Sequence, residues 1–586
     1  MSLPVSSKTQ SSESFLYTGI VESFLGKRAA LVISTLISYG RLNIKELSKR
    51  SSLSSVLVKK TLVSLIELGC ISTWEEKTYK SEITYYSFRE EGVLILHYSG
   101  EIIAHIDKTY SNDSTTQIVQ SFLSLGNLTI SEYIQSIGIE DKESIVNIEK
   151  CFTTLVNDKF LVPIQRTHFN SVEDIWLQTY RKAYSKIPKT STLSELKRTA
   201  EAKSTARLEF LNILNFEPDT LFIMDKVTTY QKVNPNISLG FNFKRFLKST
   251  RSSQLTKFCS HRVGKITSII YKYALKVTEK NSPDVINLFH QIGITNEEIH
   301  NKAEYEPKPS QLFSAKDVLK VLPKEVILKE TILNGPPKRR QSNDNQPPSS
   351  KRVKLENGYK IPEVDMGSDQ DEDDVLDDNN DFVAIDAHLR ILANSSVSFL
   401  KKTNSGLYYV PYPDVMSNLK RNVYDTVLSS TLGAPCARIL RCVRDNRLVS
   451  EKLINSTALL KEKDARSLTA QLVKFNFLQI QEIPKSADRA ASKSVFLFRI
   501  NENHSSDFIK NNVCWNMGQQ LEKISILRAE NQALISKINR DDVKGKESQY
   551  LLPSEVTQLK ELNEKELNFS IKIQRLASIW EVFKFY

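Results

Sequence analysis

Basic residues are concentrated in one stretch of the chain that holds no acidic residue. From Lys226 to Thr278 the sequence contains eleven Lys or Arg and not one Asp or Glu. Ammonium and guanidinium groups at this density suit a polyanion, because each can pair with a phosphate of DNA or RNA without reading a base. An acidic protein partner fits the same charge, so both alternatives stand. The nucleic-acid-binding candidates are Lys244, Arg245, Lys248, Arg251, Lys257, Arg262 and Lys265.

Residue patterns that would support catalysis are missing. Glycine supplies only 18 of 586 residues, and neither G-x-x-x-x-G-K-[ST] nor G-x-G-x-x-G occurs. The nucleophile elbow G-x-S-x-G is absent, and the 6 cysteines and 8 histidines lack the short spacings of a zinc site. We therefore expect no catalytic residue, no metal site, no cofactor, and reduced thiols in the core. No apolar run approaches the roughly 18 residues of a membrane span, so no membrane contact is expected.

The elements that carry these residues follow a repeated order of three helices and a β-hairpin. In the first copy, apolar residues at helical spacing run from Phe24 to Ile37, a short second helix starts at Ile44, and a third holds Val58 and Leu62. Two β-rich segments then flank the polar sequence EEKTYKSE. This is the order of a winged helix, a helix-turn-helix variant. The predicted domains are winged helices at 15–100, 110–166, 237–411 and 412–502, with a helical linker at 168–235.

The third helix of a winged helix can read DNA when its outward residues match base edges. Acidic side chains are among the outward residues here, and they would repel phosphates at close approach. We therefore expect no sequence-specific reading, and protein docking by the first two modules. The outward residues are Lys59, Lys60, Ser64 and Glu67, then Lys142, Glu143, Asn147 and Glu149, and in the last module Arg466, Gln471 and Lys474.

A segment with few large apolar residues interrupts the third predicted module. Residues 334–380 are rich in Pro, Ser, Asn, Gln and Asp and include the acidic run DQDEDDVLDDNND. Such a segment buries too little apolar surface to offset the entropy cost of ordering, so we expect it to be disordered. Two basic clusters separated by ten residues favour a nuclear-import signal over a solvated charge run, and hence a nuclear location. The import candidates are Lys338, Arg339, Arg340, Lys351, Arg352 and Lys354.

Residues 505–586 change to a heptad pattern, which predicts an antiparallel coiled-coil hairpin. Glu566 alone breaks the pattern in the second helix, and Ser554 is the expected N-cap of that helix. The terminal sequence IWEVFKFY is too aromatic for a free tail and is expected to dock. The fold class expected for the chain is thus mainly α with small β-hairpins (α+β). The coiled-coil candidates are Leu527, Leu534, Ile538, Leu562, Ile573, Leu576 and Trp580.

The order of these parts resembles the winged-helix subunit of nuclear DNA-directed RNA polymerase III in its fungal form. That family is related to the alpha chain of general transcription factor IIE. The resemblance rests on ESFLGKRAALVISTLISYGRLNIKELSKRSSL and VKKTLVSLIELGCI at the front, and on KRNVYDTVLSSTLGAPCARILRCVRDNRLVSEKLI in the fourth module. The interrupted third module and the C-terminal hairpin complete it.

The resemblance implies a non-catalytic subunit that forms a heterotrimer with two partners on the clamp of the largest subunit. It also implies contact with a general initiation factor, and a role in promoter recognition and opening at tRNA and 5S rRNA genes. DNA would be contacted without base-specific reading, and no homo-oligomer is expected. The alternative is a free-standing winged-helix transcription regulator, which would select a DNA sequence by itself.

Overall fold

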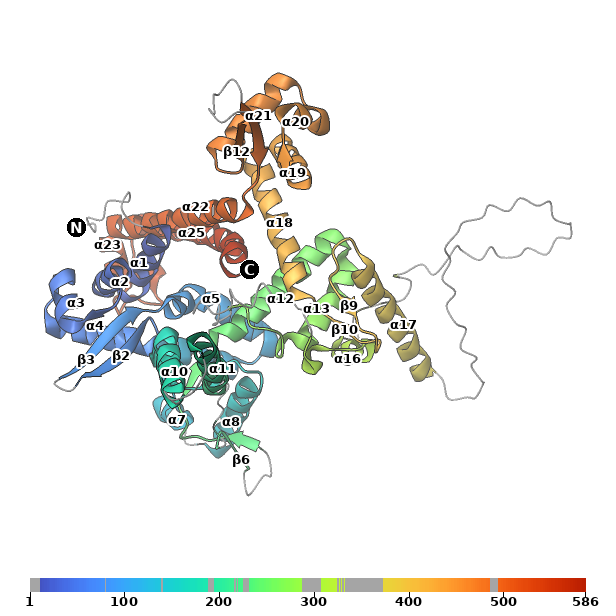
Figure 1. Ribbon diagram of the computed structural model, residues 1–586. Helices are drawn as coiled ribbons and strands as arrows, with labels where there is room; N and C mark the ends of the chain where they lie inside the picture. The colour runs from blue at the N-terminus through green and yellow to red at the C-terminus, as the bar shows by residue number, and fades with distance from the viewer. Residues whose placement is uncertain are drawn as a thin grey trace. The chain divides into compact units, whose positions relative to one another are not determined.

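The computed structural model describes residues 11–78, 81–138, 141–187, 194–214, 218, 220–224, 231–286, 307–323, 326, 328, 331, 373–484 and 494–586 (Figure 1). The chain divides into two compact units. Unit 1 comprises Met1–Thr250, Pro283–Glu304 and Met416–Tyr586, and unit 2 comprises Arg251–Ser282 and Tyr305–Val415. Within the described ranges, no helix has the length and apolar character that a membrane crossing requires.

The first winged helix begins and ends its helices where the local chemistry favours it. Gly40 ends α2 with a φ of 78°, which is strained for other residues. Asn43 and Glu46 form a capping box at the start of α3, and Ser54 caps α4. The elements are α2 (Lys27–Tyr39), β1 (Leu42–Asn43), α3 (Ile44–Ser51), α4 (Ser55–Glu67), β2 (Ile71–Thr78) and β3 (Ser81–Phe88).

The second winged helix is completed by a strand from much later in the chain. β8 (Leu239–Phe241) lies between β4 and β5, with Leu239 opposite Leu128 and Phe241 opposite Leu161. The predicted end of this module at 166 is therefore wrong, because residues 164–238 are an insertion in its wing. The local elements are α6 (Asp113–Leu125), β4 (Asn127–Leu128), α7 (Ile130–Ile137), α8 (Lys142–Asn157) and β5 (Leu161–Pro163).

The insertion leaves the second winged helix and returns to it, so the predicted helical linker does not join two modules. Its helices α10 and α11 lie side by side (Figure 1) and form a small core of their own, in which the rings of Trp176 and Phe210 are 5.6 Å apart. The elements are α9 (Arg166–Phe169), α10 (Val172–Lys186), α11 (Glu195–Leu214), β6 (Phe222–Met224) and β7 (Gln231–Val233). The basic helix α12 (Phe243–Arg262) starts directly after β8, so residues 239–241, which the predicted third module included, belong to the second.

The last winged helix of unit 1 has the same arrangement. Its sheet order is β11-β13-β12, matching β1-β3-β2 and β4-β8-β5. In each sheet the central strand is the last in the sequence. The elements are α18 (Tyr412–Thr431), α19 (Ala434–Asn446), β11 (Leu448–Val449), α20 (Glu451–Ala458), α21 (Glu462–Lys474), β12 (Gln479–Pro484) and β13 (Ser494–Arg499).

Unit 2 contains the interrupted winged helix. Phe313 takes the place of the first strand, because it forms an isolated bridge to Tyr408, which also pairs with β9. Its core includes the rings of Phe258, Tyr271 and Phe399, with Phe399 5.4 Å from the first and 5.5 Å from the second. The elements are α13 (Lys265–Glu279), η1 (Pro309–Gln311), α16 (Ala315–Val321), α17 (Asp373–Asn394), β9 (Lys401–Lys402) and β10 (Tyr408–Tyr409).

Helix α17 begins at Asp373, which lies inside the segment predicted to be disordered. The predicted insertion therefore ends too late, since residues 373–380 are helical. Residues 332–372 lie outside the described part of the chain.

Two helices that the sequence analysis did not identify join the modules of unit 1. α1 (Ser12–Leu25) precedes the first winged helix, and α5 (Glu90–Tyr110) connects the first to the second. Glycines allow close approach at that connection. A Cβ at Gly126, whose φ is 89°, would overlap the carbonyl of Glu67, and one at Gly92 would overlap the backbone of Gly69. The first two winged helices therefore meet through backbone contacts that larger residues exclude.

The C-terminal hairpin pairs α22 (Glu502–Glu530) with α25 (Pro553–Phe585), joined through α23 (Gln532–Ile538) and α24 (Glu547–Tyr550). Arg528 donates to both carboxylate oxygens of Glu566 at 2.8 and 3.1 Å, and Lys537 pairs with Glu555 at 2.7 Å. The first pair explains why Glu566 interrupts the heptad pattern. Leu534, Leu562, Ile573 and Trp580 are buried, while Leu527, Ile538 and Leu576 are half-buried.

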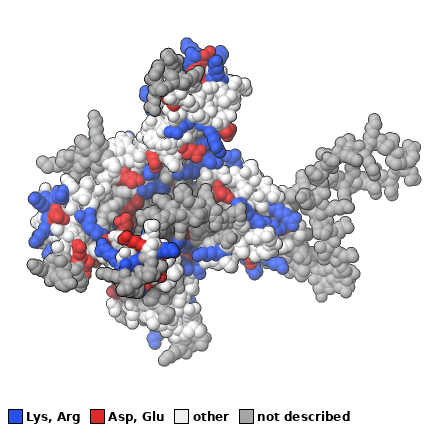
Figure 2. Space-filling model, viewed as in Figure 1, with Lys and Arg blue, Asp and Glu red and all other residues white. Residues whose placement is uncertain are grey.

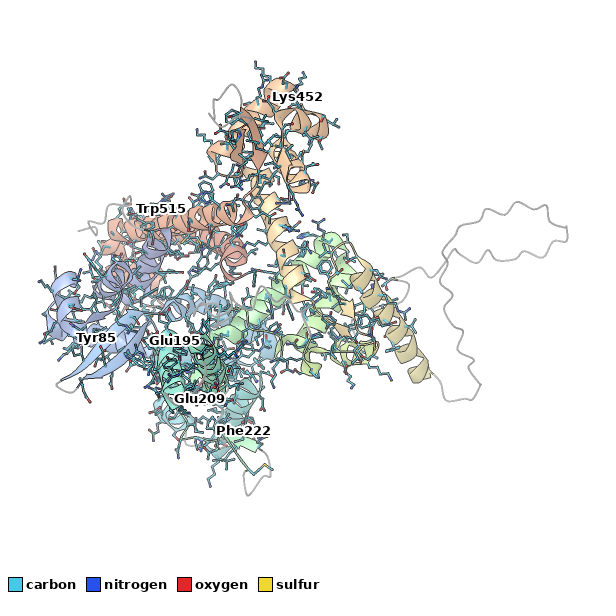
Figure 3. All side chains as sticks on the ribbon, in the orientation of Figure 1. Tyr85, Glu195, Glu209, Phe222, Lys452 and Trp515 are labelled. Carbon is cyan, nitrogen blue, oxygen red and sulfur yellow. The ribbon has the colours of Figure 1, made fainter. Side chains whose placement is uncertain are left out.

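Two details of the hairpin differ from expectation. The N-cap of α25 is Leu552, whose backbone N–H donates to Glu555 at 2.9 Å, so Ser554 lies inside the helix. Pro553 at the first helical position needs no N–H donor there, which sets the start of the helix. The hairpin also has a third helix beside it, because α1 packs on α22, with the ring centroids of Phe15 and Trp515 4.7 Å apart. Trp515 is labelled on α22 in Figure 3.

The aromatic C-terminus docks within unit 1. Trp580, Val582 and Phe583 are buried, and the Nζ of Lys584 lies 3.0 Å from a carboxylate oxygen of Glu13 on α1 and 3.0 Å from one of Glu90 on α5. Burial would lower the pKa of Lys584, but the two carboxylates outweigh it and raise that pKa above its usual value. One ammonium group thus ties the end of the chain to its first helix.

Replacing Lys584 with methionine should leave Glu90 without its cation and Glu13 with only Lys510, whose Nζ is 4.0 Å away, and lower the free energy of unfolding by about 2 kcal/mol. Because the folded pKa of Lys584 is raised, its contribution is complete below the ordinary lysine value of 10.5 and is lost as pH rises through the folded value. Urea unfolding followed by tryptophan fluorescence measures both effects. Exposed Lys560 on the same helix is the matched control. Equal loss in Lys560→Met and Lys584→Met would contradict this role.

Candidate docking and nucleic-acid surfaces

Two of the seven basic candidates are buried and already paired within the chain. Lys248 is 9% exposed, and its Nζ lies 2.8 Å from Oδ1 of Asp284. Arg251 is 3% exposed, donates to Oγ of Ser282 at 2.7 Å, and lies 4.0 Å from the centroid of the Tyr412 ring. Buried charges that lose their partner destabilise a fold strongly, so both have a structural use. The prediction that they follow a nucleic-acid backbone is therefore wrong.

Two further candidates at the start of α12 are half-buried. Arg245 donates from Nε to the backbone carbonyl of Asp158 at 3.0 Å, which holds α12 against the second winged helix. Burial would raise the pKa of Glu91, but Arg89 and Lys244 offset it and lower that pKa. Arg245 and Lys244 therefore support the packing of unit 1 and are poorly placed to bind a phosphate chain.

The other three candidates, Lys257, Arg262 and Lys265, are exposed on unit 2. Helix α13 extends the charge with exposed Lys272 and Lys276, which the sequence analysis did not select. Positions 265, 272 and 276 share one face of a helix, a spacing that was readable in the sequence. Within the described ranges, Lys265, Lys272 and Lys276 form no ion pair with a carboxylate. The exposed part of the basic stretch is thus smaller than predicted and lies on α12 and α13.

The outward residues of the third helices lie where the sequence analysis places them. All are exposed except Glu149, which is half-buried and lies 3.4 Å from Nζ of Lys232. Arg466 on α21 is paired with Glu451 and Glu462, so this arginine is committed to carboxylates of its own module. Base reading would require releasing such pairs. The outward residues of the third helices therefore suit protein contacts better than the reading of a DNA sequence.

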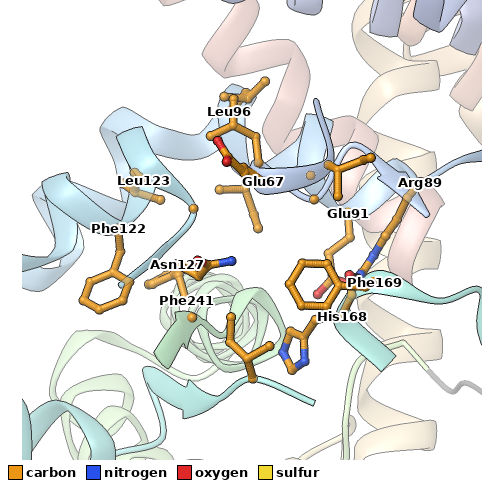
Figure 4. A pocket seen from close by; sticks show the side chains of 18 residues that line it. Glu67, Arg89, Glu91, Leu96, Phe122, Leu123, Asn127, His168, Phe169 and Phe241 are labelled. Atoms are coloured by element: carbon orange, nitrogen blue, oxygen red, sulfur yellow. Dashed lines mark hydrogen bonds and ion pairs between the residues drawn. The ribbon is translucent and has the colours of Figure 1, made fainter. Parts of the chain in front are cut away.

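A cavity of about 70 Å³ lies where the first two winged helices meet (Figure 4). The guanidinium of Arg89 lines it, donates to the backbone carbonyls of Thr167 and His168, and pairs with Glu91. Burial, followed by the charge of Arg89, lowers the pKa of His168, so the imidazole is neutral near pH 7. The volume admits only a few water molecules. This cavity therefore lies at a joint between two domains.

Other predicted features concern metals, thiols and import. In the part of the chain that the structure describes, no group of three or more His, Cys, Asp or Glu is placed to hold a metal ion. All six cysteines are free thiols, and burial raises the pKa of Cys70, Cys259 and Cys514 to about 12. The six import candidates, Lys338, Arg339, Arg340, Lys351, Arg352 and Lys354, lie outside the described residues.

Four protein families match the sequence, in an order that follows the fold. The RNA polymerase III subunit RPC82 helix-turn-helix domain matches residues 15–76, and the family RNA polymerase III subunit RPC82 matches 150–419. The POLR3C C-terminal winged-helix domain matches 424–500, and the helical hairpin domain of DNA-directed RNA polymerase III subunit RPC3 matches 533–584. The matches cover winged helices of both units and the hairpin.

Similar proteins extend over nearly the full length. DNA-directed RNA polymerase III subunit RPC3 of Eremothecium gossypii is 41% identical, covering 99% of this chain and 97% of that protein. The proteins of the same description from Saccharomyces cerevisiae and Kluyveromyces lactis are 40% and 38% identical, covering 98% and 99% of this chain and 94% of each relative. The resemblance inferred from the sequence is confirmed. The chain belongs to the family of DNA-directed RNA polymerase III subunit RPC3.

Proposed function

We propose that this chain acts in RNA polymerase III by docking on the clamp of the largest subunit, together with two partner subunits, as a heterotrimer. Membership of the family makes it an accessory subunit, with other polymerase III subunits as partners and a nuclear location. The clamp, the heterotrimer and contact with a general initiation factor are the finer proposal. In that position it would support promoter recognition, promoter opening and initiation at tRNA and 5S rRNA genes.

Exposed apolar side chains on the winged helices support a docking role. Ile480 and Ile483 on β12 and Phe496 on β13 are all exposed large hydrophobic residues of one wing. Scattered exposed apolar residues are normal, but Ile480 and Phe496 lie diagonally on one face of this hairpin, with Ile483 on the other, and exposed apolar residues on a small hairpin favour a protein interface. Charged rims around such groups are typical of protein–protein contacts. The proposal rests mainly on one observation: the winged helices and the C-terminal hairpin occur in a chain that is similar to RNA polymerase III subunits over nearly its full length.

DNA contact without base reading is the second part of the proposal. The basic surface formed by Lys257, Arg262, Lys265, Lys272 and Lys276 carries charge that attracts phosphates regardless of sequence. An acidic protein partner remains the alternative occupant of that surface. A free-standing regulator is not favoured, because the family consists of polymerase subunits and the outward helix residues include Glu67, Glu143 and Glu149.

Affinity purification of the full chain from nuclei should recover the other polymerase III subunits in stoichiometric amounts, because docking modules of this number give a stable assembly. Mass spectrometry of the purified material measures the ratio. An unrelated nuclear winged-helix protein purified in parallel is the control. Recovery of the chain alone, together with selection of one sequence from a random DNA pool, would support the regulator instead.

Charge reversal at Lys257, Arg262 and Lys265 should weaken DNA binding by the full chain. The slope of log affinity against log salt should fall by about 2 to 3, since each phosphate contact contributes about 0.9. Fluorescence anisotropy with duplex DNA at several salt concentrations measures the slope. Reversal at exposed Lys523, Lys560 and Lys572 of the hairpin is the control of equal charge. An unchanged slope would assign the three residues to a protein interface.

Alanine at Lys338, Arg339, Lys351 and Arg352 should leave the unassembled chain in the cytoplasm, because both halves of the proposed import signal lose charge. Fluorescence microscopy of a tagged chain, expressed in excess over its partners, measures the distribution. Alanine at Lys316 and Lys320 on α16 is a control that leaves both clusters intact. Nuclear entry of the unassembled four-residue variant would remove the assignment.

A further inference from the structure

The outward face of α4 in the first winged helix carries apolar side chains at its centre. Val56 is 62% exposed and Val63 is 55% exposed. They are seven residues apart, which places them two turns apart on the same face of the helix. The opposite face is the one that packs, since Val58, Leu62 and Leu65 are buried. The two valines therefore form a short apolar stripe that nothing in the described part of the first winged helix covers.

The charged residues beside this stripe are basic near the start of α4 and acidic at its end. Lys59 and Lys60 flank it on either side near the start of the helix, and Glu67 lies at its end. All three are exposed, and in the described ranges none of them forms an ion pair. Exposed Lys45 and Lys49 on α3 add to the basic end, and Lys and Arg gather over α3 and α4 in Figure 2. We define the α4 face as Val56, Lys59, Lys60, Val63, Ser64 and Glu67.

Nucleic acid is a poor occupant for the α4 face. Val56 and Val63 offer no hydrogen bond to a base edge or a phosphate. A hydrated phosphate chain beside them would leave their apolar surface in contact with water, so the hydrophobic effect would add nothing to binding. Glu67 would repel phosphates from the far end of the helix. A protein helix suits the face better, because an aliphatic row can cover the valines while its charges meet those at both ends.

We propose that the α4 face binds an amphipathic helix of another RNA polymerase III subunit. That helix would carry aliphatic residues at positions i, i+3 or i+4, and i+7, opposite Val56 and Val63. Acidic residues would lie beside Lys59 and Lys60, and a basic residue beside Glu67. Two turns of contact set a minimum length of about eight residues for the partner segment. The inference rests on the proposed function, since it takes the partner from the same polymerase.

Site-specific photocrosslinking identifies the occupant directly. Val63→p-benzoylphenylalanine, in the full chain assembled into purified polymerase, should crosslink on irradiation to one polymerase subunit. Mass spectrometry of the crosslinked peptide should give a helical segment with the aliphatic spacing and the acidic end described above. The same substitution at exposed Leu208 on α11 is the control for chance contacts. Crosslinks to promoter DNA, to this chain itself, or to a segment without that pattern would overturn the inference.

Paired variants test the energetic part. V56E/V63E should increase the loss of polymerase subunits in a salt wash about tenfold. The two valines would be buried against the partner helix, and the substitutions replace them with carboxylates that face the acidic residues of that helix. L196E/L208E, which changes two exposed leucines of α11, should behave as wild type. Unchanged thermal unfolding shows that the variants fold. Wild-type retention of V56E/V63E would overturn the inference while leaving the proposed function standing, whereas failure of the wild-type chain to recover polymerase would remove both.

Discussion

The sheets of the winged helices are closed by their last strand. In β1-β3-β2, β4-β8-β5 and β11-β13-β12 the central strand comes last in the sequence, and Tyr408 of β10 has the same place in unit 2. The first strand of each sheet has no partner until that last strand arrives. This constraint explains how the modules tolerate insertions. Loop-closure entropy grows only with the logarithm of length, and each doubling costs about 0.6 kcal/mol. Residues 164–238 can therefore separate β5 from β8 without preventing the sheet from forming.

Polar contacts and close backbone approaches then fix the modules of unit 1 in place. Arg245 holds α12 to the second winged helix through the carbonyl of Asp158, and Gly126 lets that module approach the end of α4. In the hairpin, Arg528 with Glu566 and Lys537 with Glu555 set the antiparallel register. These contacts use many of the charges that composition alone would assign to a ligand. Part of the strongly basic stretch therefore stabilises the packing of the chain, and its exposed Lys and Arg lie on α12 and α13.

The sequence predicted the helices that have one apolar stripe and clear caps. The α2–α4 group, the hairpin seam and the winged-helix order belong to this class, because helical spacing and capping residues are local signals. Pairings across long separations have no local signal, which is why β8 was assigned to the wrong module. Helix α1 was missed because its buried residues, among them Leu16, Thr18 and Val21, spread over more than half of its circumference, so no narrow apolar stripe marks it. The burial of Lys248 and Arg251 was equally hidden, since it depends on Asp284 and Ser282.

Lys584 lies almost 500 positions after Glu90, yet it completes the same ionic cluster as Glu13. At a synthesis rate of 5 to 20 residues per second, roughly 25 to 100 s pass between the synthesis of Glu90 and that of Lys584. During that time Glu13 on α1 and Glu90 on α5 lack the ammonium group of Lys584. A chain cut short by a premature stop codon would never acquire this ammonium group, so the two carboxylates would stay without it. The ionic cluster of unit 1 thus depends on a residue that is synthesised long after the helices it joins.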